Sequence, residues 1–248
     1  MRPFIIKPIK LEDCRAHGPG SKAELFLVEG DSAAGAVTVL RNPGFQACLP
    51  MQGKPLNALR ASAAKVQSNE LYQRLSESLG LALRDAQVPC AQLKLTFEEP
   101  VNPDELGALG FERVLLLFDP DADGIHIGAL MLMFFYRWMR PLLSAGRIEM
   151  VRAPLFSLTW FEPESTQTSN AFAYSVAHCL EIQSELKRRG IGEVETRHFR
   201  GLGSIDQALL HTTCIQPSTR KTQVMTLDDA RSAIAVFGGK AAHRTRGK

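Results

Sequence analysis

Residues 114–127 read VLLLFDPDADGIHI, an apolar run that ends at an acidic residue and is followed by two further aspartates at alternate positions. A continuous apolar run over residues 113–118 is typical of a parallel strand that is covered on both faces. The apolar stretch after the glycine predicts a helix over residues 125–143. The segment therefore predicts a strand, an acidic loop and a helix in succession.

A second segment of the same kind lies near the start of the chain. ELFLV at residues 24–28 has the length of a strand and ends at Glu29, and the small residues after Gly30 suit a helix packed closely on a sheet. Two such units favour an α/β fold with a mainly parallel sheet and flanking helices. Because ligands gather at the carboxyl ends of parallel strands, we expect Glu29 and Asp119 to lie together.

Four acidic residues, Glu29, Asp119, Asp121 and Asp123, would then converge at one edge of the sheet. Such a cluster repels itself without a counter-charge, and oxygen ligands select a hard divalent ion such as Mg²⁺. Two other interpretations remain open from the residues alone: turn formers with a helix cap, or a phosphatase nucleophile at D-x-D. An EF-hand loop is disfavoured, because its twelfth position is Leu130 rather than glutamate.

The composition is that of an ordinary folded protein, with 248 residues, 45% hydrophobic content and 22% charged content. A net charge of +3 is too small to predict nucleic-acid binding, so any basic surface must be local. The five cysteines are odd in number and form no C-x-x-C pair, which favours a reducing cytoplasm. No apolar segment has the length of a membrane span or of a signal peptide core, so we expect no membrane association.

Changes in composition divide the chain into three predicted parts. Residues 1–22, rich in Pro, Gly and Lys, are expected to form a leader that docks onto the folded part. Residues 23–154 hold both acidic units, and a boundary near residue 155 precedes a mostly helical tail over residues 155–248. Further strands are expected at residues 46–49, 147–151 and 155–161, and helices at 69–86, 170–189 and 206–213, with Thr226 and Asp229 capping a last helix.

Five blocks of sequence carry a resemblance to a known family. They are ELFLVEGDSAAG (24–35), LPMQGKPLN (49–57), FDPDADGIHI (118–127), FFYRWMRPL (134–142) and RHFRGLG (197–203). In this order and spacing the chain resembles the TOPRIM metal-binding domain and adjoining tail of bacterial type IIA topoisomerase B subunits, the gyrase B and topoisomerase IV E class. The resemblance implies a Rossmann-like TOPRIM fold and a part in double-strand DNA passage, in which a separate A-type subunit supplies the tyrosine that becomes linked to DNA.

The same resemblance implies roles for the four acidic residues. Glu29 matches the general acid/base that also contacts the metal, Asp119 matches a ligand shared between two metal sites, and Asp121 matches the partner of the second ion. Asp123 completes the triple-aspartate motif of the catalytic centre. The implied cofactor is one or two Mg²⁺ ions, with Mn²⁺ as a substitute, which stabilise charge on the scissile phosphate while a carboxyl returns a proton to the ribose oxygen.

The resemblance also implies four DNA-binding residues. Lys54 and Asn57 match positions near the cleaved bond, Arg41 matches a nearby basic position, and Arg200 stands where the family usually has lysine. Lysine suits a phosphate, and asparagine suits a base edge or a sugar. The implied partners are DNA, the A-type subunit and a separate ATPase and transducer chain, since only the leader precedes Glu24. The implied location is the cytoplasm, in association with the nucleoid.

Several departures from the family lower the local polarity. Gln52 and Gly128 stand where the family has basic residues, Ile125 replaces a serine, and Ser204 replaces a glutamate. Because DNA affinity depends on neutralising phosphates, these changes predict weaker binding than in an ordinary member of the family. Two alternatives to a topoisomerase component remain open: a non-catalytic paralogue that regulates the A-type subunit, and a free-standing TOPRIM metal-dependent nuclease.

Overall fold

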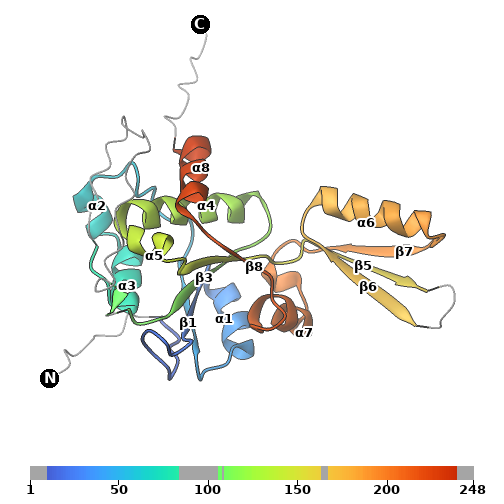
Figure 1. Ribbon diagram of the computed structural model, residues 1–248, viewed down its shortest axis with the longest axis horizontal. Coiled ribbons are helices and arrows are strands. Elements are labelled where there is room, and N and C mark those ends of the chain that lie inside the picture. Colours follow the sequence, from blue (N-terminus) through green and yellow to red (C-terminus); the bar gives the residue numbers. More distant parts are fainter. Residues whose placement is uncertain (1–9, 84–105, 108, 163–166, 239–248) are drawn as a thin grey trace, which may run out of the picture.

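A five-stranded sheet forms the centre of the computed structural model, which describes residues 10–83, 106–107, 109–162 and 167–238 (Figure 1). The strand order is β2-β1-β3-β4-β8, in which β1 to β4 run parallel and β8 pairs antiparallel with β4. The expected mainly parallel α/β sheet is therefore confirmed. The strands are β1 (Glu24–Val28), β2 (Gln46–Pro50), β3 (Arg113–Leu117), β4 (Ile148–Val151) and β8 (Thr222–Val224).

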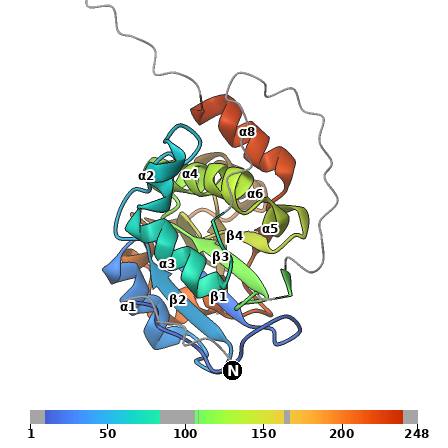
Figure 2. The ribbon, with the colours of Figure 1, turned by 90° about the vertical axis from the view of Figure 1, so that its left-hand side faces the viewer.

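Helices cover both faces of this sheet, because alternate residues of each strand point to opposite sides. Leu25 and Leu27 of β1 are buried in a core shared with α3 (Glu70–Leu79) and α4 (Ala122–Trp138). Phe26 and Val28 are buried in a second core shared with α1 (Asp31–Leu40). In Figure 1, α4 lies above the sheet and α1 below it, and Figure 2 shows the same layers from the side.

The helix after the acidic loop differs from the prediction at both ends. It begins at Ala122, because Asp121 accepts a hydrogen bond from the amide of Gly124 at 2.9 Å and caps the helix. It ends at Trp138, and after Met139 a short helix α5 (Arg140–Ser144) follows. The single helix predicted over residues 125–143 is therefore wrong, since Pro141 lacks the amide that a continuous helix requires and its ring crowds the preceding turn.

The helix predicted over residues 69–86 is shorter in the structure. The side chain of Asn69 accepts a hydrogen bond from the Tyr72 amide at 3.3 Å, so a predicted cap is confirmed. The helix α3 ends at Leu79 and is capped by Gly80, whose φ of 69° is a left-handed conformation that glycine adopts without strain. A shorter helix, α2 (Ala63–Gln67), precedes it. Residues 84–86 of the prediction lie outside the described residues.

The first half of the tail builds a small α+β unit that extends from the central sheet (Figure 1). The strands β5 (Phe156–Phe161), β6 (Thr168–Ala173) and β7 (Val194–His198) form an antiparallel sheet of order β6-β5-β7. The helix α6 (Val176–Arg188) packs against it through a small apolar core that includes Leu158. This half of the tail is richer in strands than the sequence predicts.

The start of α6 corrects the helix predicted from residue 170. Residues 168–173 are strand, because they pair with β5 and turn Ala171 and Ala173 toward the small core. The helix begins only at Val176, where the Ser175 hydroxyl accepts a hydrogen bond from the His178 amide at 3.1 Å. Pairing with the preceding strand β5 therefore overrides the local preference for helix at Asn170.

The second half of the tail returns to the central sheet. The helix α7 (Gln207–Leu210) follows the expected cap Asp206, and a π-helical turn over residues 211–215 continues it. The strand β8 joins the edge of the sheet, and α8 (Leu227–Phe237) follows it. The side chains of Thr226 and Asp229 form the predicted capping box of α8. The predicted boundary near residue 155 thus lies where the chain leaves the central sheet for the small antiparallel sheet. The chain returns to the central sheet later, as β8.

The described part of the leader runs along the free edge of the sheet beside β2. Glu12 and Cys48 exchange two backbone hydrogen bonds of 2.9 Å, and the amides of Arg15 and Ala16 donate to the loop before β2. Cys14 is buried in the first core. Among the described residues, no helix has the length and apolar character needed to cross a membrane.

Candidate metal centre

The carboxyl ends of β1 and β3 bring the predicted acidic residues together. The two strands are parallel neighbours, and Val28 at the end of β1 lies opposite Leu117 at the end of β3. Glu29 follows the first of these residues directly, and Asp119 lies two positions beyond the second. Two segments that are about 90 residues apart in the chain therefore meet at one edge of the sheet, as the strand pattern predicts.

The acidic side chains are close enough to influence one another electrostatically. The pKa of Glu29 is raised above its ordinary value, first by burial and then by the negative charges of Asp119, Asp121 and Asp123. The ammonium group of Lys54 acts in the opposite direction. Burial and the neighbouring carboxylates therefore make Glu29 hold a proton more readily than an ordinary glutamate does.

Asp119 is held by the backbone of two other segments. The amide of Leu202 donates a hydrogen bond to its Oδ1 at 2.9 Å, from a residue 83 positions further along the chain. At Gly124 a Cβ atom would lie 1.9 Å from the Asp119 carbonyl oxygen, so only glycine fits at that point of the first helical turn. The sequence marks R-G-L-G as a block of the family, but it does not reveal that this block touches Asp119.

The other two aspartates belong to the N-terminus of α4. Asp121 caps the helix through the Gly124 amide, so the helix-cap interpretation is correct for this residue. Asp123 lies in the first turn, is exposed, and has its Oδ1 3.5 Å from the Nζ of Lys54. A helix N-terminus favours negative charge, which helps to stabilise both carboxylates at this position.

The donor set suits a hard divalent ion, because all four side chains offer carboxylate oxygens. Asp119, Asp121 and Glu29 are the residues that would hold it. Among the residues that the structure describes, no three of the four carboxyls have oxygens within 4.8 Å of one another. This spacing is expected of like charges that repel one another.

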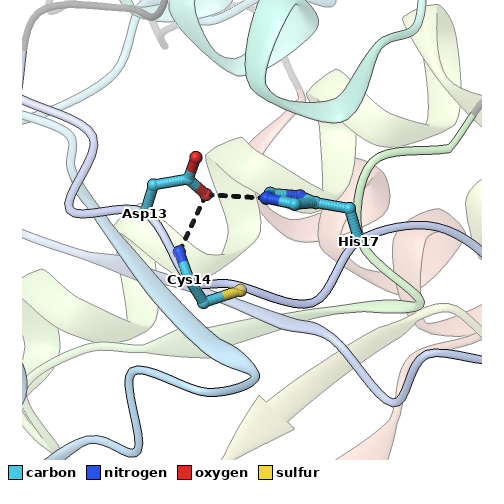
Figure 3. A group of neighbouring side chains, drawn as sticks. All are labelled: Asp13, Cys14 and His17. Atoms are coloured by element: carbon cyan, nitrogen blue, oxygen red, sulfur yellow. Dashed lines mark hydrogen bonds and ion pairs between the residues drawn. The ribbon is translucent and has the colours of Figure 1, made fainter.

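The described residues contain one tighter group of metal-binding side chains, formed by Asp13, Cys14 and His17 in the leader (Figure 3). The carboxylate of Asp13 accepts a hydrogen bond from the Cys14 amide at 2.8 Å and lies 3.4 Å from the Nε2 of His17. The thiol of Cys14 donates to the carbonyl of Ala16 at 3.1 Å, and burial raises its pKa to about 11. These contacts order a turn of the leader.

Two of the predicted DNA-binding residues lie close to the acidic cluster. Lys54 is half exposed and contacts Asp123. Arg200 is exposed and directly precedes the two residues that contact Asp119. The Lys54 side chain and the Arg200 backbone are therefore near the acidic cluster.

The other two predicted DNA-binding residues make structural contacts. The Oδ1 of Asn57 accepts hydrogen bonds from the amides of Leu59 and Arg60 at 3.1 and 3.2 Å, and so orders the turn after GKP. The side chain of Arg41 is only 8% exposed, and its Nη1 donates to the carbonyl of Asp13 at 3.0 Å. Its contacts tie the leader to the sheet, and the structure does not favour a DNA contact for Arg41.

Comparison with known proteins identifies the class. The Toprim domain family matches residues 24–153, and the chain belongs to this family. The chain is similar to the novobiocin-resistant DNA gyrase B subunit of Streptomyces niveus, with 32% identity over 232 residues, and to the DNA gyrase B subunit of Mycobacterium leprae (strain TN), with 34% identity over 235 residues. The identity is 33% over 233 residues with the DNA gyrase B subunit of Mycobacterium tuberculosis (strain ATCC 25618 / H37Rv).

The similarity extends over most of this chain but only part of each relative. Each of the three alignments covers 93% of this chain and 31% of the relative. The chain therefore spans about a third of the length of the curated relatives it matches. The predicted resemblance to gyrase B and the predicted TOPRIM fold are both confirmed.

Proposed function

We propose that this chain is a B-type component of a type IIA DNA topoisomerase, an isomerase that acts as part of a complex, and that it supplies a Mg²⁺-dependent carboxylate centre for DNA cleavage and religation. The convergence of Glu29 with Asp119, Asp121 and Asp123 at the ends of β1 and β3 carries this proposal. The similarity to DNA gyrase B subunits supports the reaction class.

In the proposed reaction a tyrosine of the A-type subunit releases its phenolic proton to water and forms a bond to phosphorus, and the bond from phosphorus to a ribose oxygen breaks. A divalent ion bound by Asp119, Asp121 and Glu29 would stabilise the charge on the phosphate and on the leaving oxygen. Glu29 donates a proton to that oxygen as the bond breaks and takes it back on religation. In the metal-free protein its pKa is raised, so the carboxyl holds a proton to a higher pH than an ordinary glutamate, whereas a bound cation would act in the opposite direction.

Lys54 and Arg200 are the residues that we propose for phosphate contacts, and Asn57, in the chain segment after Lys54, is a further candidate. The tyrosines of this chain have other surroundings: Tyr72 and Tyr136 are buried, and the ring of Tyr174 lies 4.7 Å from the Nζ of Lys221. The nucleophile is therefore assigned to the A-type partner. We assign no ATP-hydrolysing step to these residues, and an ATPase part would complete the enzyme.

The test is Mg²⁺-dependent cleavage of supercoiled plasmid with an A-type gyrase subunit and an ATPase part added. Wild type should give linear DNA with protein attached, whereas Glu29→Gln and Asp121→Asn should each lower the yield by about 100-fold or more. Asp228→Asn neutralises an exposed carboxylate on α8 and is the matched control. If both site variants cleaved as wild type does, the assigned centre would be wrong.

Two further outcomes would replace the proposal with an alternative. Nicking of plasmid by this chain and Mg²⁺ alone would indicate a free-standing nuclease. Binding to the A-type subunit without cleavage in the complete mixture would indicate a regulatory paralogue.

A further inference from the structure

A loop of the tail lies directly on the acidic cluster. Its residues 200–203 have the sequence RGLG, and the amide of Leu202 donates to Asp119 Oδ1 at 2.9 Å. At Gly201 a Cβ atom would lie 2.6 Å from Asp119 Oδ2, 3.1 Å from its Cγ and 3.3 Å from Oδ1. One oxygen of the Asp119 carboxylate therefore accepts a hydrogen bond from this loop, and the other lies where a side chain at position 201 would stand.

The need for glycine at position 201 comes from this contact and not from the backbone conformation. Gly201 has φ 160° and ψ 170°, an extended conformation that any residue adopts. Gly203, two residues later, has only the Oγ of Ser32 within reach of a Cβ, at 4.0 Å. The same loop therefore contains one glycine without space for a side chain and one with space.

The loop is fixed in place by its own neighbours. The side chain of Leu202 is buried in the core that contains Phe26 and Val28 of β1. The Oγ of Ser204 accepts a hydrogen bond from the Arg200 amide at 3.0 Å and donates to the Gly201 carbonyl at 2.7 Å. An amide held this firmly is a preorganised donor, and its bond to a carboxylate is charge-assisted.

We propose that residues 200–203 position Asp119 for the divalent ion: the Leu202 amide sets the orientation of the carboxylate, and Gly201 leaves the space that the carboxylate occupies. This inference rests on the proposed function. Groups that orient a metal ligand commonly change metal affinity by about 10- to 100-fold when they are removed. The central sheet thus supplies the ligand, and the tail supplies the contact that orients it.

The first experiment compares Gly201→Ala with Gly203→Ala, measuring Mn²⁺ binding by calorimetry without DNA or partner proteins. Gly201→Ala should weaken Mn²⁺ binding by about 10-fold or more. Gly203→Ala should stay within about twofold of wild type, since its methyl group meets nothing closer than 4.0 Å. Thermal unfolding in EDTA, measured alongside, reports whether each variant is folded.

The second experiment removes the donor without adding a side chain. Replacing Leu202 by its α-hydroxy acid analogue turns the amide into an ester, which removes the N–H group and keeps the leucine side chain. Mn²⁺ binding should again weaken by about 10-fold or more. This variant decides the question if Gly201→Ala fails to fold.

The outcomes separate this inference from the proposed function. If Asp119→Asn loses Mn²⁺ binding while Gly201→Ala and the ester variant bind as wild type does, the metal site stands and the positioning role is wrong. Tighter binding by Gly201→Ala would also overturn it, because the loop would then obstruct the ion. If wild type and Asp119→Asn bind Mn²⁺ equally, the metal site itself is wrong and the positioning role falls with it.

Discussion

Removal of Arg220 is expected to detach the returning tail from the central sheet. Its guanidinium donates to both carboxylate oxygens of Glu24 at 2.7 and 2.5 Å, and to the carbonyl of Ile215 at 3.1 Å. Gln46 donates to the same carboxylate at 2.9 Å. Because the Arg220 and Glu24 side chains are only 4% and 5% exposed, Arg220→Met leaves a buried carboxylate without its positive partner.

The magnitude follows from the burial of this pair. Removing one partner of a buried ion pair costs about 3–5 kcal/mol, because the remaining charge is neither hydrated nor paired. This is a large fraction of the roughly 5–15 kcal/mol that stabilises a typical domain. Replacing both partners in Glu24→Leu/Arg220→Met removes both charges, so this double variant should regain about half of the loss.

Urea unfolding followed by tryptophan fluorescence measures these free energies, since Trp138 and Trp160 are both buried. Arg188→Met is the control, because the Arg188–Glu185 pair is 75% and 52% exposed and its loss should change the free energy of unfolding by less than about 0.5 kcal/mol. A loss below about 1 kcal/mol for Arg220→Met would refute the reasoning. So would a double variant whose loss equals the sum of the two single losses, which would show that the charges are not coupled.

Three further predictions concern the site and the helices. In urea unfolding, Gly124→Ala should destabilise the fold by about 1–3 kcal/mol, because its Cβ would lie 1.9 Å from the Asp119 carbonyl oxygen. Gly35→Ala in α1 is the control: its added methyl group has no atom within 4 Å, so it should stabilise the fold by up to about 1 kcal/mol. Equal effects of Gly124→Ala and Gly35→Ala would argue against the close contact between position 124 and the Asp119 carbonyl. Because the pKa of Glu29 is raised in the folded state, the stability that its carboxyl contributes should fall as pH rises above the unfolded pKa of about 4.3. In EDTA, the free energy of unfolding of Glu29→Gln should therefore increase relative to that of wild type between pH 4 and pH 8. A difference in unfolding free energy between the two proteins that did not depend on pH would contradict the raised pKa of Glu29. Asn69→Ala removes the cap of α3 and should cost about 1 kcal/mol in urea unfolding, and an unchanged midpoint would show that the cap is not needed.

The central sheet could be predicted because its signals are local. Apolar runs of strand length mark β1 and β3, and each run ends at an acidic residue. The prediction failed where strand pairing or a nearby proline overrides the local apolar pattern. Residues 168–173 become strand because β5 pairs with them, and the break at Met139 depends on how Pro141 affects the preceding turn.

The sequence predicts which acidic residues lie together at the candidate site, but not the contacts that hold them in place. Strand order alone brings Glu29 to the aspartates, since both strands end at the same edge. The contact from Leu202 to Asp119 joins residues 83 positions apart and uses a backbone amide, which carries no mark in the sequence. Arg41 matches a motif position that implies a DNA contact, and what the sequence does not reveal is that its side chain is 8% exposed and donates to the Asp13 carbonyl of the leader.

Calorimetric titration of the metal-free chain with Mg²⁺ tests most directly whether Glu29, Asp119 and Asp121 form one metal site. Wild type should bind Mg²⁺, and Glu29→Gln, Asp119→Asn and Asp121→Asn should each weaken binding by about 10-fold or more. Asp228→Asn, which neutralises an exposed carboxylate elsewhere, should bind as wild type does. Equal Mg²⁺ affinity in all five proteins would contradict the metal centre on which the proposed function depends.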